Sequence, residues 1–329
     1  MEPVDQHAFQ EQQRQMYAKE GSIANALKHV KYKIAVLSGK GGVGKTATTV
    51  NLAAALRNTG HRVGVFDADL HGPSVPKMLG VKKEAKLNGG FWLDPVTTES
   101  GIKALSVALF WPGDMTPVMW RGQAKSRTIR QLLSAAKWGG LDFLLVDLPP
   151  GTGDEPIAIL KSIPDLDGVI IVTTPQEVST LVCSKAINAS LTLGAHVLGL
   201  VENMSQYTCR CCGDVVHLFG QDKGRNLARM MEIPFLGSIP IDPLFSEAAD
   251  AGVPIVNLHP DSVTARAFTE MAAGLVLSLP PKEVPEAPVE ESKPCPGSGH
   301  HRHEHHEHGG GGGEGATCNH PHHHHHKHS

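Results

Sequence analysis

Lys33-Ile-Ala-Val-Leu-Ser38 leads directly into Gly39-Lys-Gly-Gly-Val-Gly-Lys-Thr46, and a helix-forming stretch at Asn51–Leu56 follows. The first segment is a short apolar run of the kind that forms a buried strand. The second satisfies the pattern G-x-x-x-x-G-K-[ST], whose glycines let backbone N–H groups and a helix N-terminus surround a phosphate. Because the pattern lies between a strand and a helix, as it requires, we interpret it as a nucleotide site rather than a chance match.

This interpretation gives each part of the loop a role. Lys45 is expected to reach the β- and γ-phosphates, and the Thr46 hydroxyl to bind Mg²⁺. The predicted contacts to the nucleotide from the loop and the following helix are Gly39, Gly41, Gly42, Val43, Gly44, Lys45, Thr46 and Thr48.

Further apolar runs repeat the strand pattern at 62–67, 142–147, 168–173 and 197–201, and helical patterns lie at 122–138, 154–161 and 177–192. Continuous apolar strands that alternate with helices imply a parallel sheet covered on both faces. We therefore predict a doubly wound, mostly parallel α/β sheet with helices on both faces, without internal repeats. In such a sheet, ligands bind at the carboxyl ends of the strands.

Composition divides the 329 residues into three parts. For residues 1–30 we predict one exposed helical extension, and for residues 31–279 we predict the α/β domain. From 280 onward Pro, Glu, Gly and His replace apolar residues, so we predict a disordered tail over 280–329. Residues 281–329 carry the whole net charge of −3, which leaves 26 basic and 26 acidic residues upstream.

Several classes of protein are disfavoured by these counts. A domain without a basic excess argues against a nucleic-acid partner. No run reaches the roughly 18 apolar residues that span a bilayer, and the N-terminus has no apolar signal core. Six cysteines are too few for a disulfide scaffold, so we expect a cytoplasmic protein in a reducing compartment, without a membrane partner.

Polar residues follow several of the predicted strands. Asp67-Ala-Asp69 ends the second strand, and Asp147 begins the segment D-L-P-P-G-T-G-D. Carboxylates at strand ends beside a phosphate-binding loop suit Mg²⁺ coordination and orientation of an attacking water. Glu202-Asn203-Met-Ser follows another strand, and Ile239-Pro-Ile-Asp-Pro243 lies further along the chain.

Lys40 inside the loop resembles the second lysine of the deviant Walker A ATPases, which include the nitrogenase iron protein, septum-site ATPases and partition ATPases. A second segment narrows the resemblance from these ATPases in general to one group, the Mrp/ApbC-type iron–sulfur carriers. It runs from Glu202 to Gly213 and reads E-N-M-S-Q-Y-T-C-R-C-C-G. Shared segments over residues 30–275 also include D-A-D-L-H-G-P-S-V-P (67–76), W-R-G (120–122), D-L-P-P-G-T-G-D (147–154) and L-F-G (218–220).

The resemblance implies roles for individual residues. Lys40 would act across a homodimer on the partner's nucleotide, and Asp69 would position the attacking water. Asp67 and Asp147 would support Mg²⁺ through its waters, Asn203 would read the base, and Pro240 and Asp242 would form a second base-side loop. The implied activity is an ATP-dependent scaffold and carrier that passes a [4Fe–4S] cluster to apo-proteins, with assembly factors as further partners.

Cys209 and Cys212 have the spacing that lets two thiolates face one metal. A [4Fe–4S] cluster needs four ligands, so two per chain favour a cluster shared by a homodimer. Half of a zinc site, a redox pair and an incidental group of cysteines are the alternatives, and the role of Cys211 is left open. Cys183 lies in an apolar helical stretch and is interpreted as a core residue.

The tail contains 13 of the 20 histidines, and Cys295 and Cys318 flank the first histidine cluster at 300–308. Imidazoles at this density bind Ni²⁺, Zn²⁺, Cu²⁺ or Co²⁺ without a fixed geometry. Because Glu, Arg, Pro and Cys interrupt the histidines, we favour a native metal-buffering extension over an expression tag. This leaves a nickel or other metal-insertion NTPase as an alternative function, while a membrane- or DNA-positioning ATPase lacks support in the sequence.

Overall fold

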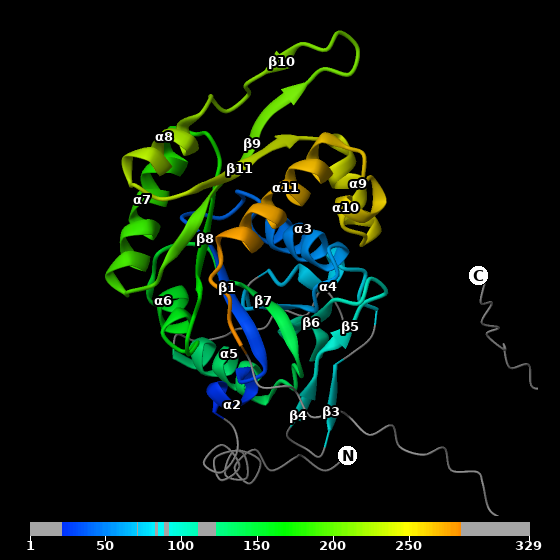
Figure 1. The fold of residues 1–329 in the computed structure, drawn as a ribbon, viewed down its shortest axis with the longest axis vertical. Helices are drawn as coiled ribbons and strands as arrows, with labels where there is room; N and C mark the ends of the chain where they lie inside the picture. The colour runs from blue at the N-terminus through cyan, green and yellow to red at the C-terminus, as the bar shows by residue number, and fades with distance from the viewer. Residues whose placement is uncertain (1–21, 71, 83–84, 89–91, 111–122, 284–329) are drawn as a thin grey trace, which may run out of the picture. The chain divides into compact units, whose positions relative to one another are not determined.

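Val-, Ile- and Leu-rich strands form the central sheet of the protein, seen between two groups of helices in Figure 1. The computed structural model describes residues 22–70, 72–82, 85–88, 92–110 and 123–283. Within these residues the sheet has nine strands in the order β10-β9-β8-β1-β7-β2-β6-β5, and β11 pairs with β9. All pairs are parallel except β9–β10 and β5–β6, so the predicted mostly parallel sheet is confirmed.

The strands are β1 (Val30–Ser38), β2 (Val63–Asp67), β5 (Val96–Thr97), β6 (Lys103–Ser106), β7 (Leu141–Asp147), β8 (Gly168–Thr173), β9 (Val197–Thr208), β10 (Val215–Val216) and β11 (Phe235–Ile241). A separate antiparallel pair is formed by β3 (Lys86–Asn88) and β4 (Trp92–Asp94). In the main sheet, β1 lies between β7 and β8, so the loop that follows β1 occupies the middle of the sheet's carboxyl edge. This is the edge at which open α/β sheets bind ligands.

Helices cover both faces of the sheet because successive strand residues point to opposite sides. Ile34 and Val36 of β1 belong to one core, with α3 (Lys45–Asn58), α4 (Val75–Met78), α9 (Pro243–Ala251), α10 (Ile255–Leu258) and α11 (Val263–Ser278). Ala35 and Leu37 belong to the other core, with α2 (Ile23–Leu27), α5 (Gln123–Ala135), α6 (Asp154–Leu160), α7 (Glu177–Thr192) and α8 (Lys223–Met230). A short 3₁₀ turn spans Val107–Phe110. The doubly wound α/β architecture is thereby confirmed.

Two boundaries differ from the sequence expectation. Instead of one exposed helix up to residue 30, residues 22–30 contain the five-residue helix α2, whose Leu27 is buried, and then the start of β1. At the other end, Tyr32 Oη donates to the carbonyl of Pro280 at 2.8 Å, and Lys282 Nζ lies 2.5 Å from Asp167 Oδ1. Residues Pro280–Lys282 therefore pack against the N-terminal end of β1, beyond the expected boundary at 279.

The remaining predicted features at the termini, residues 1–21 and the His-rich segment from 284, lie outside the described residues. No helix among the described residues is long and apolar enough to cross a membrane.

Candidate nucleotide and thiolate site

The loop between β1 and α3 is held in shape by glycines and by two neighbouring elements. Gly42 and Gly44 have φ values of 77° and 82°, in the left-handed region that glycine adopts without strain. A Cβ on Gly39 would lie 2.8 Å from the backbone nitrogen of Cys183 in α7, so only glycine permits this approach. From the other side, Asn203 Nδ2 donates to the carbonyl of Val43 at 2.9 Å.

Asp147, at the end of β7, accepts hydrogen bonds from three polar side chains of α3. Lys45 Nζ and Thr46 Oγ1 each lie 2.6 Å from Asp147 Oδ2, and Thr49 Oγ1 donates to Oδ1 at 2.7 Å. Asp147 is fully buried and Lys45 is 6% exposed, so this is a charge pair largely removed from water. Such a pair holds the ammonium and the hydroxyl close together at the start of the helix.

Asp67 is the neighbour of Asp147 in the register of β2 and β7. It accepts hydrogen bonds from Asp69 N at 3.1 Å, Val75 N at 3.3 Å and Ser106 Oγ at 3.1 Å. Burial, and next the negative charge of Asp147, raise the pKa of Asp67 to about 7. The end of the sheet therefore holds one carboxyl group that titrates near neutral pH.

The two residues predicted to be catalytic, Asp69 and Lys40, flank this carboxyl edge. Asp69 lies half-buried after β2, and Gly72 N donates to its Oδ1 at 3.4 Å. Lys40 Nζ donates to Gln176 Oε1 at 2.8 Å, and Gln176 is the N-cap residue of α7. Lys40 is thus directed along the surface toward α7 rather than into the buried cluster around Asp147.

The donor set fits a Mg²⁺-bound phosphate. The start of a helix preceded by a glycine-rich turn offers unpaired N–H groups to an anion, and Lys45 supplies a cation beside them. Thr46 and Asp147 carry oxygen atoms of the kind that Mg²⁺ and its bound waters prefer. By contrast, the buried Thr48 hydroxyl donates to the Gly44 carbonyl at 2.9 Å, so it is used inside the helix.

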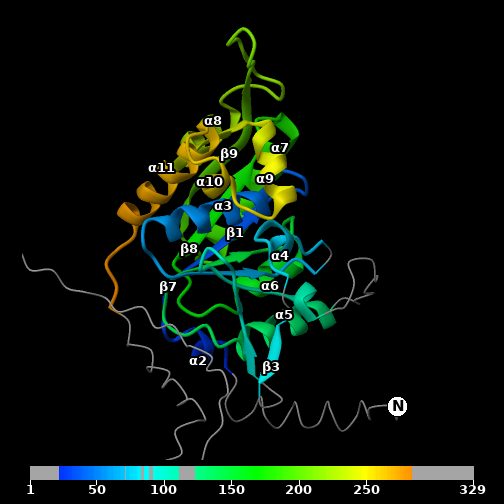
Figure 2. The same cartoon turned by 90° about the vertical axis from the view of Figure 1, so that its right-hand side faces the viewer.

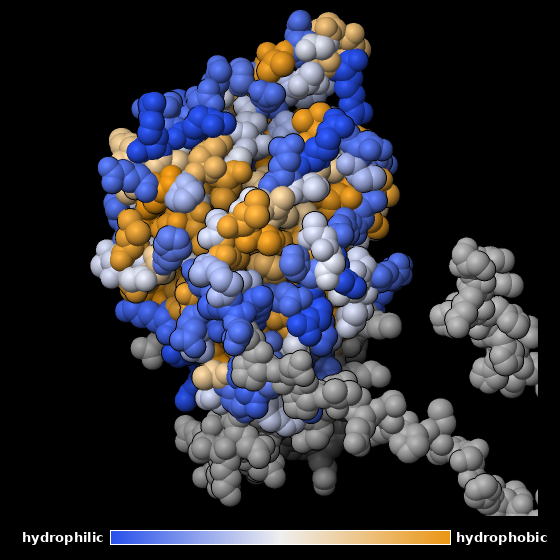
Figure 3. Space-filling model, in the orientation of Figure 1, coloured by the Kyte–Doolittle hydropathy of each residue, from blue (hydrophilic) through white to orange (hydrophobic). Residues whose placement is uncertain are grey.

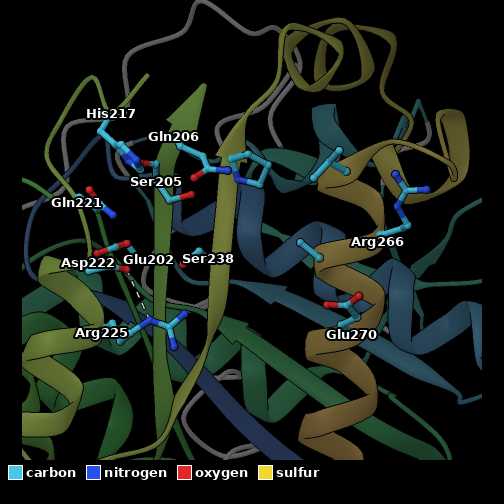
Figure 4. A pocket seen from close by; sticks show the side chains of 13 residues that line it. Glu202, Ser205, Gln206, His217, Gln221, Asp222, Arg225, Ser238, Arg266 and Glu270 are labelled. Atoms are coloured by element: carbon cyan, nitrogen blue, oxygen red, sulfur yellow. Dashed lines mark hydrogen bonds and ion pairs between the residues drawn. The ribbon is translucent and has the colours of Figure 1, made fainter. Parts of the chain in front are cut away.

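The predicted base-side residues lie on β9 and β11. Asn203 follows Glu202 in β9, and Pro240 is in β11, whose only strand partner among the described residues is β9. A polar cavity of about 440 Å³ borders β11 and is shown in Figure 4. Among the predicted nucleotide contacts only Pro240 lines it; the other lining residues include Glu202, Ser205, His217, Arg225, Arg266 and Glu270.

Burial raises the pKa of Glu202, whose Oε2 accepts the Gly224 N–H of α8 at 2.5 Å. This bond ties β9 to the start of α8. His217, next to the cavity, has Nδ1 3.4 Å from the Ser205 carbonyl.

Cys209, Cys211 and Cys212 lie in the hairpin turn between β9 and β10. Gly213 N donates to the Cys209 carbonyl at 2.9 Å, and Cys209 N to the Asp214 carbonyl at 2.8 Å, which closes the turn. Hydrogen bonds from the backbone N–H groups of Cys212 and Cys211 lower the pKa of Cys209. These bonds favour the thiolate, the form that ligates metals. Cys211 and Cys212 are exposed.

Cys183 does not belong to this turn. It is buried in α7, and burial raises its pKa to about 12, which agrees with its interpretation as a core residue. In the described part of the chain, no three His, Cys, Asp or Glu side chains converge to hold a metal ion. Residues 120–122, Cys295, Cys318 and the tail histidines lie outside the described residues.

One contact joins the cysteine turn to the base-side loop. Arg210 Nη2 donates to Asp242 Oδ1 at 3.1 Å. Asp242 also accepts Leu244 N at 3.1 Å, as the N-cap of α9, and Thr264 Oγ1 at 3.3 Å near the start of α11. The same carboxylate therefore contacts the hairpin and two helices.

Sequence reasoning did not single out Thr49, Gln176, Ser106 or Arg210. Thr49 is the only one with a local signal, because it follows Lys45 by four residues and so shares its helix face. The others contact predicted site residues from distant parts of the chain.

Comparison with known proteins places this geometry in a family. The family model ParA, described as NUBPL iron-transfer P-loop NTPase, matches residues 29–276. The iron-sulfur cluster carrier protein of Methanocaldococcus jannaschii is 49% identical over 240 residues, which cover 73% of this chain and 83% of that protein. The cytosolic Fe-S cluster assembly factor nubp2 of Danio rerio is 40% identical over 267 residues, 79% of this chain and 99% of that protein.

Solved structures show the same fold. The nucleotide-binding protein of Archaeoglobus fulgidus in complex with ADP is 38% identical, with a TM-score of 0.62 over 70% of this chain and 90% of that one. The cell division ATPase MinD of Pyrococcus furiosus is 25% identical, with a TM-score of 0.56 over 75% of this chain and 98% of that one. Since the match spans nearly the whole α/β domain, the chain belongs to the ParA family of P-loop NTPases, in its NUBPL iron-transfer group.

Proposed function

We propose that the protein is an ATP-dependent scaffold and carrier that binds a [4Fe–4S] cluster between two copies of the chain and transfers it to apo-proteins. The observation that carries this proposal is the cysteine turn itself. Backbone N–H groups already point at the Cys209 sulfur, and the turn directly follows β9, the strand that carries the predicted base-reading residue Asn203. The names of the relatives support the same cargo.

Each chain would supply the thiolates of Cys209 and Cys212. Within one chain the described residues offer no group of three ligands, so a second chain would complete the set of four. Cys211 would contribute its N–H to the Cys209 sulfur, a role that does not need its own thiol.

The phosphate-binding loop would bind ATP. Gly39, Gly41, Gly42, Val43 and Gly44 would provide backbone contacts, Lys45 would neutralise phosphate charge, and Thr46 with Asp147 would hold Mg²⁺, with Asp67 behind them. When bound, Mg²⁺ would neutralise the negative charge of the phosphates while the terminal phosphoryl group is transferred to water. Asp69 would orient the attacking water. Lys40 would act on the partner's nucleotide.

Nucleotide would act on the cargo through the arrangement of the two chains. ATP would favour one arrangement of the dimer and hydrolysis would release it, which changes cluster affinity or client access. The chemistry performed is then ATP hydrolysis, and the cluster is carried rather than altered.

Anaerobic reconstitution with iron and sulfide tests the proposal. We expect about four irons per dimer, measured by iron and sulfide analysis together with the mass of the loaded species. Cys209→Ala and Cys212→Ala should each abolish the cluster, whereas Cys183→Ala, the matched control, should keep it. Cys211→Ala should also keep it if only its N–H matters. Four irons bound by a monomer, or zinc bound in place of iron, would contradict the proposal.

A further inference from the structure

Strand β11 forms one edge of the sheet. Leu200 of β9 is the register partner of both Ile171 in β8 and Phe235 in β11, so β8 and β11 lie on opposite sides of β9. Among the described residues β9 is the only strand that pairs with β11. Residues 235–238 are half-buried rather than fully covered. Alternate residues of β11 therefore direct backbone N–H and C=O groups outward, as at any sheet edge.

The polar cavity of about 440 Å³ lies over this open edge. Figure 4 shows Asp222 and Arg225 on one side of β11, and Arg266 and Glu270 of α11 on the other. Ser238 of β11 lines the cavity as well, and both α8 and α11 contact the strand. We call the outer edge of β11 together with these five residues the edge groove.

The edge groove is accessible but recessed. Helix α11 lies on the outside of the domain in Figures 1 and 2, and Figure 3 shows hydrophilic surface over α8 and over the upper part of α11. The backbones of paired strands lie about 4.8 Å apart. In a second copy the same two helices flank β11, so they would collide before two such edges came that close. A single extended chain has no flanking helices and can enter.

The charges on the α8 side of the groove are used within the protein. Arg225 Nε lies 3.6 Å from Asp222 Oδ1, and the Arg225 guanidinium lies over the ring of Phe235, 4.4 Å from its centroid. By contrast, no ion pair within the described ranges involves Arg266 or Glu270, and both are exposed. The α11 side therefore presents a cation and an anion about one helical turn apart.

This spacing matches an extended peptide. Residues four apart on a helix are separated by about 6 Å along its axis, and side chains two apart on a strand by about 6.8 Å. One acidic and one basic residue with a single residue between them would thus both point toward α11. The acidic side chain would face Arg266 and the basic one Glu270. In this mode of recognition backbone hydrogen bonds give affinity and the side chains give specificity.

We infer that the edge groove binds an extended segment of an apo-protein client, which adds to the sheet as a strand beside β11 and carries such an acid–x–base pair. The inference rests on the proposed function, which requires clients but does not place them. Backbone pairing accepts many sequences, which suits a carrier that serves several apo-proteins. Strand β9, the neighbour of β11, continues into the cysteine turn, so the bound segment lies one strand away from the strand that leads to the cluster ligands.

The chain's own C-terminal sequence is a poorer match to the groove. Prolines at 285, 288, 294 and 296 interrupt it, and proline lacks the N–H that a strand ladder needs. The longest proline-free run between the first and last of these prolines is 289–293, which is shorter than the seven residues of β11.

Fluorescence anisotropy with the cluster-free full chain tests the site. The probe is a labelled Ser-Thr-Val-Asp-Val-Lys-Val-Thr-Ser peptide, and the control peptide has Asp and Lys adjacent, so that they point to opposite faces. We expect the probe to bind about fivefold or more tighter than the control peptide and to slow hydrogen–deuterium exchange of residues 235–241. Arg266→Glu should reverse the preference in favour of a Lys-x-Lys peptide. Arg229→Glu, on α8 outside the groove, is the matched control.

A second measurement tests the link to clients. The probe sequence is fused to the N-terminus of the apo-form of a [4Fe–4S] ferredoxin, and cluster transfer from the loaded full chain is followed. Transfer should be about fivefold or more faster than to the same ferredoxin fused to the control peptide, because binding in the groove raises the local concentration of the acceptor.

Equal binding of the two peptides, or peptide binding that Arg266→Glu leaves unchanged, would overturn the inference, and so would fusions that transfer at equal rates. Truncation after Glu283 that raises probe affinity fivefold would assign the groove to the tail instead. Probe-induced dissociation of a cluster-free dimer would assign it to a second copy; either result contradicts a client site. A chain that binds the probe but no cluster would overturn the proposed function, so the two failures are distinguishable.

Discussion

The guanidinium of Arg210 and the carboxylate of Asp242 form an ion pair at 3.1 Å. Arg210 lies in the cysteine turn and Asp242 is the N-cap residue of α9, so the pair joins the turn to the start of this helix. Asp242 is 14% exposed and Arg210 is 56% exposed, so the pair is worth about 1 kcal/mol at most. That magnitude is small for stability, yet it equals a several-fold change in an equilibrium between two arrangements of the turn.

Replacement of Arg210 should uncouple the turn from the base-side loop. In the wild type, ADP should slow hydrogen–deuterium exchange of residues 205–216 by about two- to fivefold. In Arg210→Gln this effect should disappear while ADP affinity stays within twofold, because Arg210 does not contact the phosphate-binding loop. Arg225→Gln, on α8, is the matched control. Retention of the full nucleotide effect in Arg210→Gln would show that the ion pair carries no coupling.

Replacement of Lys45 should have two separable effects. Lys45→Ala should weaken ADP and ATP binding at least about 100-fold, and it leaves Asp147 buried without its cation, which costs about 3 kcal/mol of unfolding free energy. Lys45→Ala/Asp147→Asn should recover stability without recovering affinity, as measured by urea denaturation and calorimetry. The exposed Lys185→Ala is the control. Near-normal affinity in Lys45→Ala would remove the nucleotide site from this loop.

Lys40 should matter for hydrolysis more than for binding. If it acts on the partner's transition-state charge, Lys40→Ala should lower ATP turnover at least about 10-fold with little change in affinity. Mixing Lys40→Ala with Asp69→Asn chains should restore part of the activity, because one of the two sites then has both groups. Lack of recovery after confirmed subunit exchange would argue that Lys40 acts within its own chain.

The raised pKa of Asp67 predicts that the stability difference between the wild type and Asp67→Asn depends on pH. Its pKa rises from 3.8 to about 7 on folding, so ionisation favours the unfolded chain increasingly as pH rises from about 4 to 7. Asp67→Asn cannot ionise, so its unfolding free energy relative to the wild type should increase by about 1 to 4 kcal/mol between pH 5 and pH 8. Urea denaturation in EDTA without nucleotide measures this. A difference that is constant with pH would contradict the raised pKa.

Truncation should show where the domain ends. Cutting after Glu283 should leave nucleotide binding, the cluster and thermal stability unchanged, and it should remove the nickel and zinc binding that we assign to the histidine-rich tail. Cutting after Leu279 also removes the contacts of Pro280 and Lys282 with Tyr32 and Asp167, so it should lower the unfolding free energy by about 1–2 kcal/mol. Loss of the cluster after either cut would make Cys295 or Cys318 a ligand.

The main strands and helices were predictable because their signals are local. The apolar runs at 142–147 and 168–173 fall on β7 and β8, and the helical pattern at 177–192 coincides with α7. Asp67 and Asp147 could be brought together from sequence alone, since parallel strands end at one edge of the sheet. Burial of Asp67, and next the charge of the adjacent Asp147, then account for its raised pKa.

The parts that sequence missed depend on contacts between distant segments. Strand β9 continues to Thr208, past the predicted end at 201, because its second half pairs with β10 and β11 rather than being buried on both faces. The Arg210–Asp242 contact spans 32 residues and requires β9 and β11 to be neighbours. No periodicity in either segment signals that pairing.

Gly39, at the start of the phosphate-binding loop, packs directly against the backbone of α7. No side chain lies between the glycine and the backbone of Val182 and Cys183 to absorb a displacement, and packed interiors have low compressibility. The outer side of α7 exposes Val178 and Leu181, while its N-cap residue Gln176 holds Lys40. A displacement of α7 would therefore also displace Gly39, the first residue of the phosphate-binding loop.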